Sequence, residues 1–356
     1  LTSNYGLAIA HYGDYCWLSA PYGVWRAKLT EERIDLTADI LSVREELDKT
    51  SGRLIVELRN DDGRYASPGQ GDLSMLDIGC QLEFSPGYRT TAGNEVSSGQ
   101  AFILDAYEHT SSGGKASLVL YASDAWSLIE NWKARHQFRW NKQTNEMSVK
   151  DTLAFVVGRC GLKLEVKSQS SVITSFYPDF TIHPNNGGIT VITRLLSFIP
   201  DVLFVEGNKA YVVNPLATDS SIYSYGASHP LIEGKYQKGP CELNRVQVEG
   251  YDPVNSKPVV VNSFSWSGIN KLYDKLSQLE DRNIDTIEEA QARGEAYLRQ
   301  AEIESANGTI RIPTNCGQQL YDVIDITDSR AGLTGEKKRV LGLTLVYNPH
   351  RGEYET

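Results

Sequence analysis

Two short polar segments contain residue types that could hold a cation or a phosphate group. Asn60-Asp61-Asp62-Gly63 offers side-chain oxygens, but an EF-hand loop needs ligands at alternating positions and a terminal glutamate. The acids here are adjacent and that glutamate is missing, so the segment predicts a tight turn. Ser112-Gly113-Gly114-Lys115 could belong to a phosphate loop, but His109 and Ala116 stand where that loop needs Gly and Ser or Thr. We therefore expect a hairpin tip.

The histidines and aspartates form no recognisable catalytic pattern. Neither HExxH nor GxSxG occurs, and Ser265-Trp266-Ser267-Gly268 lacks the first glycine of the second motif. Asp322, Asp325 and Asp328 flank a predicted strand, whose alternation sends Asp325 to the face opposite the other two. The six histidines are far apart in the sequence: His11, His109, His136, His183, His229 and His350. We predict no catalytic, cofactor-binding or metal-binding residue and no enzyme activity, although a triad assembled from distant parts of the chain stays open.

Residues 132–140, WKARHQFRW, are the one segment in which basic and aromatic residues alternate. Such a run could stack on bases or sugars. More often it is the exit of a helix, where half-buried rings and long cationic stems cover apolar surface. We favour that packing role. A protein–protein contact is the best functional alternative, because Trp and Arg are common interface anchors.

The composition is typical of a globular protein and argues against a protein whose main role is to bind nucleic acid. Its 356 residues, 40% hydrophobic and 22% charged, suffice for two or three domains. The net charge of −10 argues against phosphate binding, which needs clustered Lys and Arg, but lets DNA slide past without adhering. The five cysteines are scattered and never form CxxC, so they predict no disulfide framework or zinc site and favour folding in a reducing cytosol.

The sequence shows no signal peptide at its start and no run long enough for a membrane helix. No apolar run approaches the ~20 residues of a membrane helix. The first residues lack the basic region and the apolar core of a signal peptide. Because the chain begins at Leu1 and not at a methionine, we expect that it is processed or trimmed.

Residues 31–125 are expected to form an all-β domain after an N-terminal arm at 1–30. The strand at 53–59 alternates, with Leu54, Val56 and Leu58 on its buried face. A glycine-rich loop joins the last two of the other predicted strands in a hairpin. Those strands span 34–43, 80–84, 99–108 and 115–122. Strands at this spacing predict a small barrel or sandwich.

Residues 126–217 are predicted to be an α+β module. Helices are expected at 124–132 with Asp124 as N-cap, from Ser148 to Gly158, and at 189–199 before Pro200. The predicted strands span 163–166, 202–206 and 209–213.

Residues 218–356 return to β structure around one long helix at 285–306. Thr286 and Glu289 have the spacing of a capping box at the start of that helix. The predicted strands span 241–251, 258–266, 308–312, 320–326 and 339–347.

Two regions of the sequence resemble one known family. The first is the exit of the strand at 53–59, which resembles the phrase L-x-N-x-D-G-R-Y/F-S-P of hub proteins from phage tail tips and baseplates, with Ala66 as an interruption. The residues that carry it are Leu58, Asn60, Asp62, Gly63, Arg64, Tyr65, Ser67 and Pro68. The second region is similar to the opening and closing segments of the second barrel of such hubs. It comprises Asn244-Arg245-Val246-x-Val248-x-Gly250, G-x-I-x-I-P at 308–313 and LYDVIDI at 320–326.

The resemblance implies a mainly β fold, in which two small tail-tube-like β-barrel domains flank the α+β module. It also implies a homotrimer whose paired barrels build a pseudo-six-fold ring in the virion tail, assembled in the bacterial host cytoplasm. Such a ring joins a tail tube or distal tail protein on one side to a spike or tip protein on the other. In such a ring, DNA is a non-specific cargo that passes through without being bound. The spike base of bacterial secretion needles shares this architecture, so the resemblance does not separate phage from secretion device.

A second hypothesis is a β-rich protein that binds or degrades carbohydrate. The tyrosine and tryptophan content and the scattered carboxylates support it. It predicts a groove with exposed aromatic rings and a pair of acids about 5–10 Å apart. A tail component that binds a host receptor is a third, weaker possibility.

Overall fold

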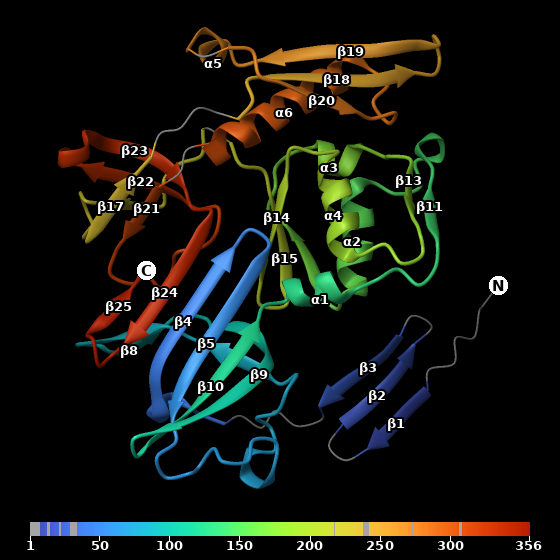
Figure 1. The fold of residues 1–356 in the computed structure, drawn as a ribbon. Coiled ribbons are helices and arrows are strands. Elements are labelled where there is room, and N and C mark those ends of the chain that lie inside the picture. The colour runs from blue at the N-terminus through green and yellow to red at the C-terminus, as the bar shows by residue number, and fades with distance from the viewer. Residues whose placement is uncertain are drawn as a thin grey trace.

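A computed structural model shows a mainly β chain with an α+β module, which confirms the predicted fold class (Figure 1). The structure describes the backbone of strands β1 (Ala8–Tyr12), β2 (Tyr15–Ala20) and β3 (Gly23–Lys28), which pair in that order. It then describes residues 34–216, 218–237, 242–271, 273–305 and 308–356. Among the described helices, none combines the length and the apolar character that crossing a bilayer requires.

The largest sheet has seven strands in the order β25-β24-β4-β5-β10-β9-β6. Its bounds are β4 Ile40–Asp48, β5 Ser51–Arg59, β6 Gln81–Phe84, β9 Gln100–Ser112, β10 Lys115–Ser123, β24 Gly342–Asn348 and β25 Glu353–Glu355. On β5, Leu54, Val56 and Leu58 are buried as predicted, against Phe102 of β9 and Leu118 of β10. The small hairpin β7 (Gly87–Thr90) and β8 (Gly93–Val96) follows β6.

The last strands of the chain complete this first sheet, which the sequence did not predict. β24 pairs antiparallel with β4, and Ile312 and Thr356 exchange backbone hydrogen bonds of 2.9 Å beyond β25. The division of the chain at 125 and 217 stays a prediction, but strands from the closing segment lie in the sheet of the opening one. Several predicted strand bounds were also wrong: the strands predicted to start at 34, 241, 320 and 339 begin at Ile40, Arg245, Val323 and Gly342.

The α+β module lies between the opening and the closing β regions. Its helices are α1 Trp126–Asn131, α2 Val149–Arg159, α3 Val172–Ser175 and α4 Gly188–Leu196. Its strands are β11 Phe138–Trp140 paired with β13 Phe180–Ile182, and β12 Lys163–Val166, β15 Lys209–Val213 and β14 Val202–Glu206 in one sheet. α2 begins at the predicted place, and Ser148 is its N-cap, because the Ser148 side chain accepts a bond from the amide of Asp151. Asp124 lies one residue before the N-cap of α1, yet its carboxylate accepts from the amide of Trp126 at 3.0 Å.

The closing region forms three small sheets besides its contribution to the first one. The first contains β16 Tyr223–Tyr225, β22 Val323–Asp328 and β23 Leu333–Arg339, and the second contains β17 Glu233–Tyr236 and β21 Gly308–Arg311. Because β17 and β21 pair with each other, the chain between them leaves and returns at one place. We call the described residues 242–305 of this excursion the lobe.

The lobe is a three-stranded sheet covered on one face by a long helix. Its elements are β18 Arg245–Asp252, β19 Lys257–Phe264, α5 Trp266–Lys271, β20 Leu276–Glu280 and α6 Ile287–Ser305. Val246 and Val248 of β18 pack with Ala290 and Leu298 of α6. The predicted start of the helix is confirmed, since Thr286 Oγ1 accepts from the amide of Glu289 at 3.2 Å. The short 3-10 helices of the chain are η1 Thr37–Asp39, η2 Gly71–Leu73, η3 Lys142–Thr144 and η4 Ser329–Ala331.

Candidate functional site: junctions, groove and exposed faces

The turn after β5 uses its polar side chains to close the end of the sheet. Asn60 Oδ1 accepts from the amide of Tyr65 at 2.8 Å, and Asp62 Oδ1 accepts from the amide of Arg64 at 3.1 Å. Tyr65 is fully buried in the core of the first sheet. The prediction of a tight turn is therefore confirmed. In the described part of the chain, no three His, Cys, Asp or Glu side chains lie close enough to hold a metal ion.

Asp39, the last residue of the 3-10 helix η1 just before β4, binds the same turn. Its carboxylate accepts from Tyr65 Oη at 2.7 Å and pairs with Arg64 at 2.8 Å and Arg59 at 3.3 Å. The hydrogen bond from Tyr65 is the main reason that the pKa of Asp39 lies below its usual range. Burial, and then Asp39, raises the pKa of Tyr65 to about 12. The segment from Asn60 to Tyr65, which resembles the hub motif, therefore has a structural role. Its contacts with Asp39 hold the turn in place, and we call them the latch.

The other singled-out motifs have separate structural roles. Ser112 and Lys115 are register partners at the tip of the β9–β10 hairpin, as predicted. The three aspartates around β22 do not share a site. Asp322 accepts from Gln318 and Gln319, Asp325 accepts from Ser221 and Asp328 accepts from Tyr236.

The basic and aromatic run at 132–140 packs against the core of the module. Trp132, Phe138 and Trp140 are partly buried there, and Phe138 and Trp140 stack with centroids 6.2 Å apart. The Arg159 guanidinium lies 4.6 Å from the centroid of Phe155, which contacts both of those rings edge-on. The packing interpretation of this run is confirmed.

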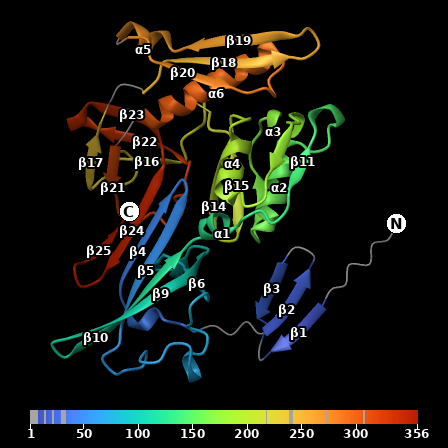
Figure 2. The same ribbon diagram turned by 45° about the vertical axis from the view of Figure 1, so that its right-hand side comes forward.

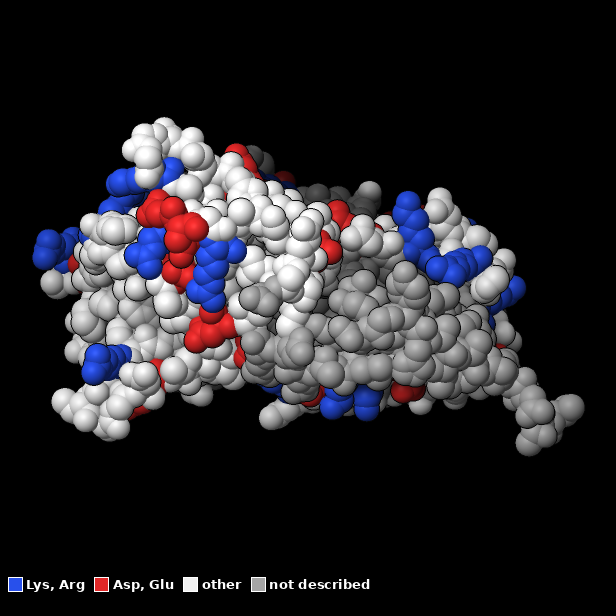
Figure 3. All heavy atoms as spheres, turned by 90° about the horizontal axis from the view of Figure 1, so that it is seen from below, with Lys and Arg blue, Asp and Glu red and all other residues white. Residues whose placement is uncertain are grey.

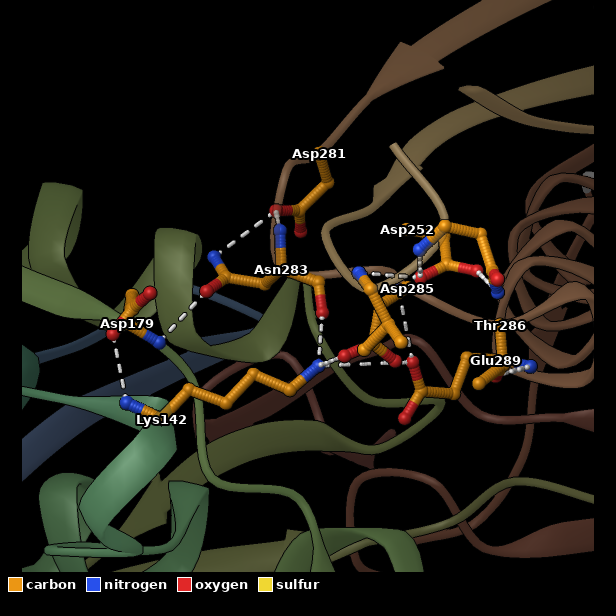
Figure 4. A network of polar contacts seen from close by, with 10 residues as sticks. Lys142, Asp179, Asp252, Asp281, Asn283, Asp285, Thr286 and Glu289 are labelled. Carbon is orange, nitrogen blue, oxygen red and sulfur yellow. Dashed lines mark hydrogen bonds and ion pairs between the residues drawn. The ribbon is translucent and has the colours of Figure 1, made fainter. Parts of the chain in front are cut away.

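A polar network joins the lobe to the α+β module, and Figure 4 shows that Lys142 reaches across into it. Lys142 Nζ lies 2.7 Å from Asp285 and 3.9 Å from Glu289, and it donates to the carbonyl of Asn283 at 2.7 Å. Its side chain is only 25% exposed, so water screens these contacts weakly. Lys142 belongs to the α+β module, and it therefore pairs across the junction with two acids of the lobe, Asp285 and Glu289.

Backbone groups and one arginine extend the same junction. Asp179 accepts from the amide of Lys142 at 2.7 Å, and its own amide donates to Asn283 Oδ1 at 2.7 Å. Arg293 of α6 lies over the ring of Phe198 at 5.6 Å, and burial lowers its pKa to about 10 although Asp281 opposes the shift. Sequence reasoning missed this junction, because its residues come from segments that are distant in the chain.

Two carboxylates mark a second junction, between the first sheet, the module and the closing region. Glu45 lies on the core side of β4 and is 9% exposed. Burial, with the negative charge of Glu206 as the second cause, raises the pKa of Glu45 to about 7. Glu206 at the end of β14 accepts from Gln319 Nε2 at 3.1 Å. The site can therefore hold a proton on Glu45 near neutral pH.

A groove of about 1390 Å³ lies between the first sheet and the strands of the closing region. Apolar residues such as Ile55, Ile310 and Ile326 line it, together with ion-paired groups. Arg311 binds Glu355 there at 3.2 Å. Three tyrosines also line the groove, but none is exposed: Tyr225 is 2% exposed, and Tyr236 and Tyr347 are half-buried.

Charged side chains of both signs are interspersed on the described part of the face in Figure 3. No patch of a single sign dominates that part of the face. An interface for nucleic acid would instead show clustered Lys and Arg. The described part of this face shows no such extended cluster.

Comparison with solved structures identifies the fold. A tail protein from Neisseria meningitidis MC58 matches with a TM-score of 0.66 and 10% identity, over 89% of this chain and 90% of that one. The 43 kDa tail protein of prophage MuSo2 from Shewanella oneidensis matches with a TM-score of 0.61 and 9% identity, over 95% of both chains. The prophage tail protein gp18 from Listeria monocytogenes EGD-e matches with a TM-score of 0.56 and 11% identity, over 91% and 90%.

This chain has the fold of phage and prophage tail proteins. No family model matches its sequence, and no curated protein sequence does. The predicted resemblance to tail proteins is therefore confirmed at the level of the fold.

Proposed function

We propose that this chain is the structural hub of a phage or phage-like tail tip or baseplate. In this role three copies form a ring that joins a tail tube or distal tail protein on one side to a spike or tip protein on the other. Each chain contributes an opening and a closing β region, so three chains present six β units to a six-fold tube. The hub acts through its shape and needs no catalytic residue. Its place is the virion tail, after assembly in the bacterial cytoplasm.

The observation that carries this proposal is the match of nearly the whole chain to three tail proteins. A match of that extent includes the module and the lobe, not only a common β sheet. Within the chain, polar contacts tie the module to the closing β region at two places, through Lys142 and through Glu206, which suits a part that transmits force without changing shape.

The charge of the chain suits a channel through which DNA passes. Three copies carry three times −10, about −30. Acidic surface repels phosphate, so we expect an acidic lumen that does not retain DNA. A lumen potential that is strongly positive in the assembled ring would contradict this part of the proposal.

The carbohydrate hypothesis receives less support. The groove exists, but its tyrosines are buried or half-buried and Glu355 is held by Arg311. A glycan-binding groove needs exposed ring faces beside its acids, and this groove presents none, so we do not propose this function.

The hub proposal predicts a trimer in solution. Sedimentation velocity of the purified chain at micromolar concentration should give three times the mass of one chain, and electron micrographs should show rings with a central opening. A chain that stays monomeric both alone and with a tube protein of the same phage would overturn the proposal.

A further inference from the structure

Two buried side chains of the α+β module carry oxygen atoms that no hydrogen bond satisfies. Both carboxylate oxygens of Asp201 and the Oδ1 atom of Asn214 are closed to solvent, and no donor in the described part of the chain bonds them. Asp201 as a whole is only 4% exposed. A buried carboxylate has lost its hydration, so in proteins such a group is nearly always paired with a cation or bound to a metal ion. These oxygens therefore mark a place where a positive partner would be strongly stabilised.

The sheet of the module makes the two side chains neighbours. β14 and β15 pair antiparallel with Val202 opposite Val213, so the next pair at this end of the sheet is Asp201 and Asn214. Because side chains alternate along a strand, both lie on the same face as Val212, which is buried in the core of the module. The helix α4 lies next to β14 and β15 in both views (Figures 1 and 2). The acceptor oxygens are thus on the core side of the sheet, at its end.

Ser168 brings a further oxygen to the same end of the sheet. It follows β12, and its amide donates to the carbonyl of Val212 at 3.0 Å. Burial raises the pKa of Asp201, and the nearby Ser168 side chain opposes only part of that shift without donating a hydrogen bond. The Ser168 hydroxyl oxygen accepts from the amide of Ser170 at 3.0 Å, and its second lone pair is left for another contact.

The protein supplies acceptors around Asp201 and no positive charge. No described Lys, Arg or His forms an ion pair with this carboxylate or lowers its pKa. Lys167 is close in sequence, but its ammonium lies 4.0 Å from the ring centroid of Tyr211, on the opposite face of the sheet. Helix α4 ends at Leu196, five residues before Asp201, so the negative end of its dipole lies at this end of the sheet as well. The surroundings therefore favour a cation over a bare carboxylate.

We propose that Asp201, Asn214 and Ser168 bind a calcium ion, with backbone carbonyls or water completing its coordination. Carboxylate, amide and hydroxyl oxygens are hard ligands, and Ca²⁺ accepts about six to eight of them in irregular geometry, whereas Mg²⁺ requires a near-ideal octahedron. Only one ligand is an acid, so the site differs from the clusters of three His, Cys, Asp or Glu that the described chain lacks. With a single carboxylate, the dissociation constant should be about 10⁻⁴–10⁻³ M.

The ion would fix the point at which three parts of the molecule meet. Asn214 is followed by the connection to the closing region, where the carbonyl of Leu216 accepts from Arg339 at 2.9 Å. On the other side of Asp201, Val202 lines a small cavity together with Ala296 of the lobe helix α6. A bound ion would tie the end of β15 to the start of β14 and so stiffen this joint. The inference goes beyond the hub proposal and does not depend on a trimer.

Calcium titration of the whole chain tests the site. After removal of divalent ions with EDTA, isothermal titration calorimetry should detect binding of CaCl₂, and MgCl₂ should bind more weakly. In urea denaturation, Ca²⁺ at about ten times its dissociation constant should lower the unfolding equilibrium constant about tenfold. Asp201→Asn keeps the shape of the side chain but removes its charge, so this variant should lose both effects. Asn214→Ala should weaken Ca²⁺ binding by about tenfold or more, as the loss of even an outer contact can.

Glu165→Gln is the matched control. Glu165 lies on β12 of the same sheet but pairs with Lys209 at 2.9 Å, so this variant should bind Ca²⁺ like the wild type. Circular dichroism in EDTA checks that each variant is folded. If the wild-type chain shows neither binding nor stabilisation, Asp201 is instead held protonated and the inference is overturned. Equal responses of the wild type, Asp201→Asn and Asn214→Ala would overturn it too, because the ion would then bind elsewhere. Neither result bears on whether the chain forms a ring.

Discussion

At the scale of single residues, Glu45 is the most informative side chain of the first sheet. It sits between Val43 and Leu47 on the core side of β4, where a glutamate is rare. Because its folded pKa is about 7, above its ordinary value, the folded state prefers the protonated form. The stability that this proton confers is complete in acid, below the pKa of the unfolded chain, and is lost as the pH rises through about 7.

The variant Glu45→Gln tests whether stability falls with rising pH because Glu45 loses its proton. The amide keeps the shape of the neutral acid and cannot ionise, so the variant should be more stable than the wild type by up to about 3 kcal/mol at pH ~8.5 and nearly equal to it at pH ~4.5. Chemical denaturation at both pH values measures the difference. Glu46→Gln is the control, because Glu46 pairs with Arg44 on the outside at 2.6 Å. A gain for Glu45→Gln of the same size at both pH values would contradict the assignment.

The sequence predicted those features that depend on contacts between neighbouring residues, such as turns and helix caps. It did not predict which charged side chains are buried. The turn at 60–63, the helix start at Ser148 and the cap at Thr286 follow from side chains that bond neighbouring amides, so the pattern alone predicts them. Glu45 and Lys142 look like ordinary surface charges in the sequence. Only the fold shows that one is buried in the sheet and the other is shared between modules.

At the scale of elements, Lys142 is the contact on which the junction between lobe and module depends most. Lys142→Met removes the cation but keeps the stem, and leaves Asp285 and Glu289 beside each other without a counter-charge. We expect a loss of about 1–3 kcal/mol in the free energy of unfolding of this junction, typical of a partly buried pair that loses one member. Hydrogen exchange should quicken in residues 281–289 and in the first turn of α6.

Lys163→Met is the matched control for that experiment. Lys163 lies 3.6 Å from Glu165, but its side chain is 73% exposed. Exposed pairs contribute about 0–1 kcal/mol, so exchange at the junction should stay unchanged. Equal behaviour of the two variants would show that Lys142 does not hold the lobe.

Gly226 is the glycine that the pairing of β16 with β22 requires. Its φ is +85°, and a Cβ there would overlap the carbonyl oxygen of Thr327. Gly226→Ala should therefore lower stability by several kcal/mol, from backbone strain of about 1 kcal/mol together with the clash. Gly207→Ala is the control, since Gly207 has a φ of +58° with nothing within 4 Å. Urea denaturation should separate the two, and equal losses would refute the close approach.

At the scale of the whole molecule, the order of segments was predictable but their pairing was not. The helices at α2, α4 and α6 and the hairpin β14–β15 lie close to their predicted positions, because each depends on contacts local in sequence. The pairing of β24 with β4 joins residues that are hundreds of positions apart, and strand alternation is the same whichever neighbour a strand finds. The polar junctions were unpredictable for the same reason.

The position of β24 also bears on how the protein is made. While the ribosome is still synthesising the chain, β4 lies at an unfinished edge, with its hydrogen-bonding groups on that side unpaired. That edge closes only when Gly342–Asn348 emerges, long after β4 itself has been synthesised. A nascent chain that stalls before this segment leaves the edge of β4 unpaired, so cells that make copies truncated before Gly342 should accumulate aggregates and not soluble, partly folded chains.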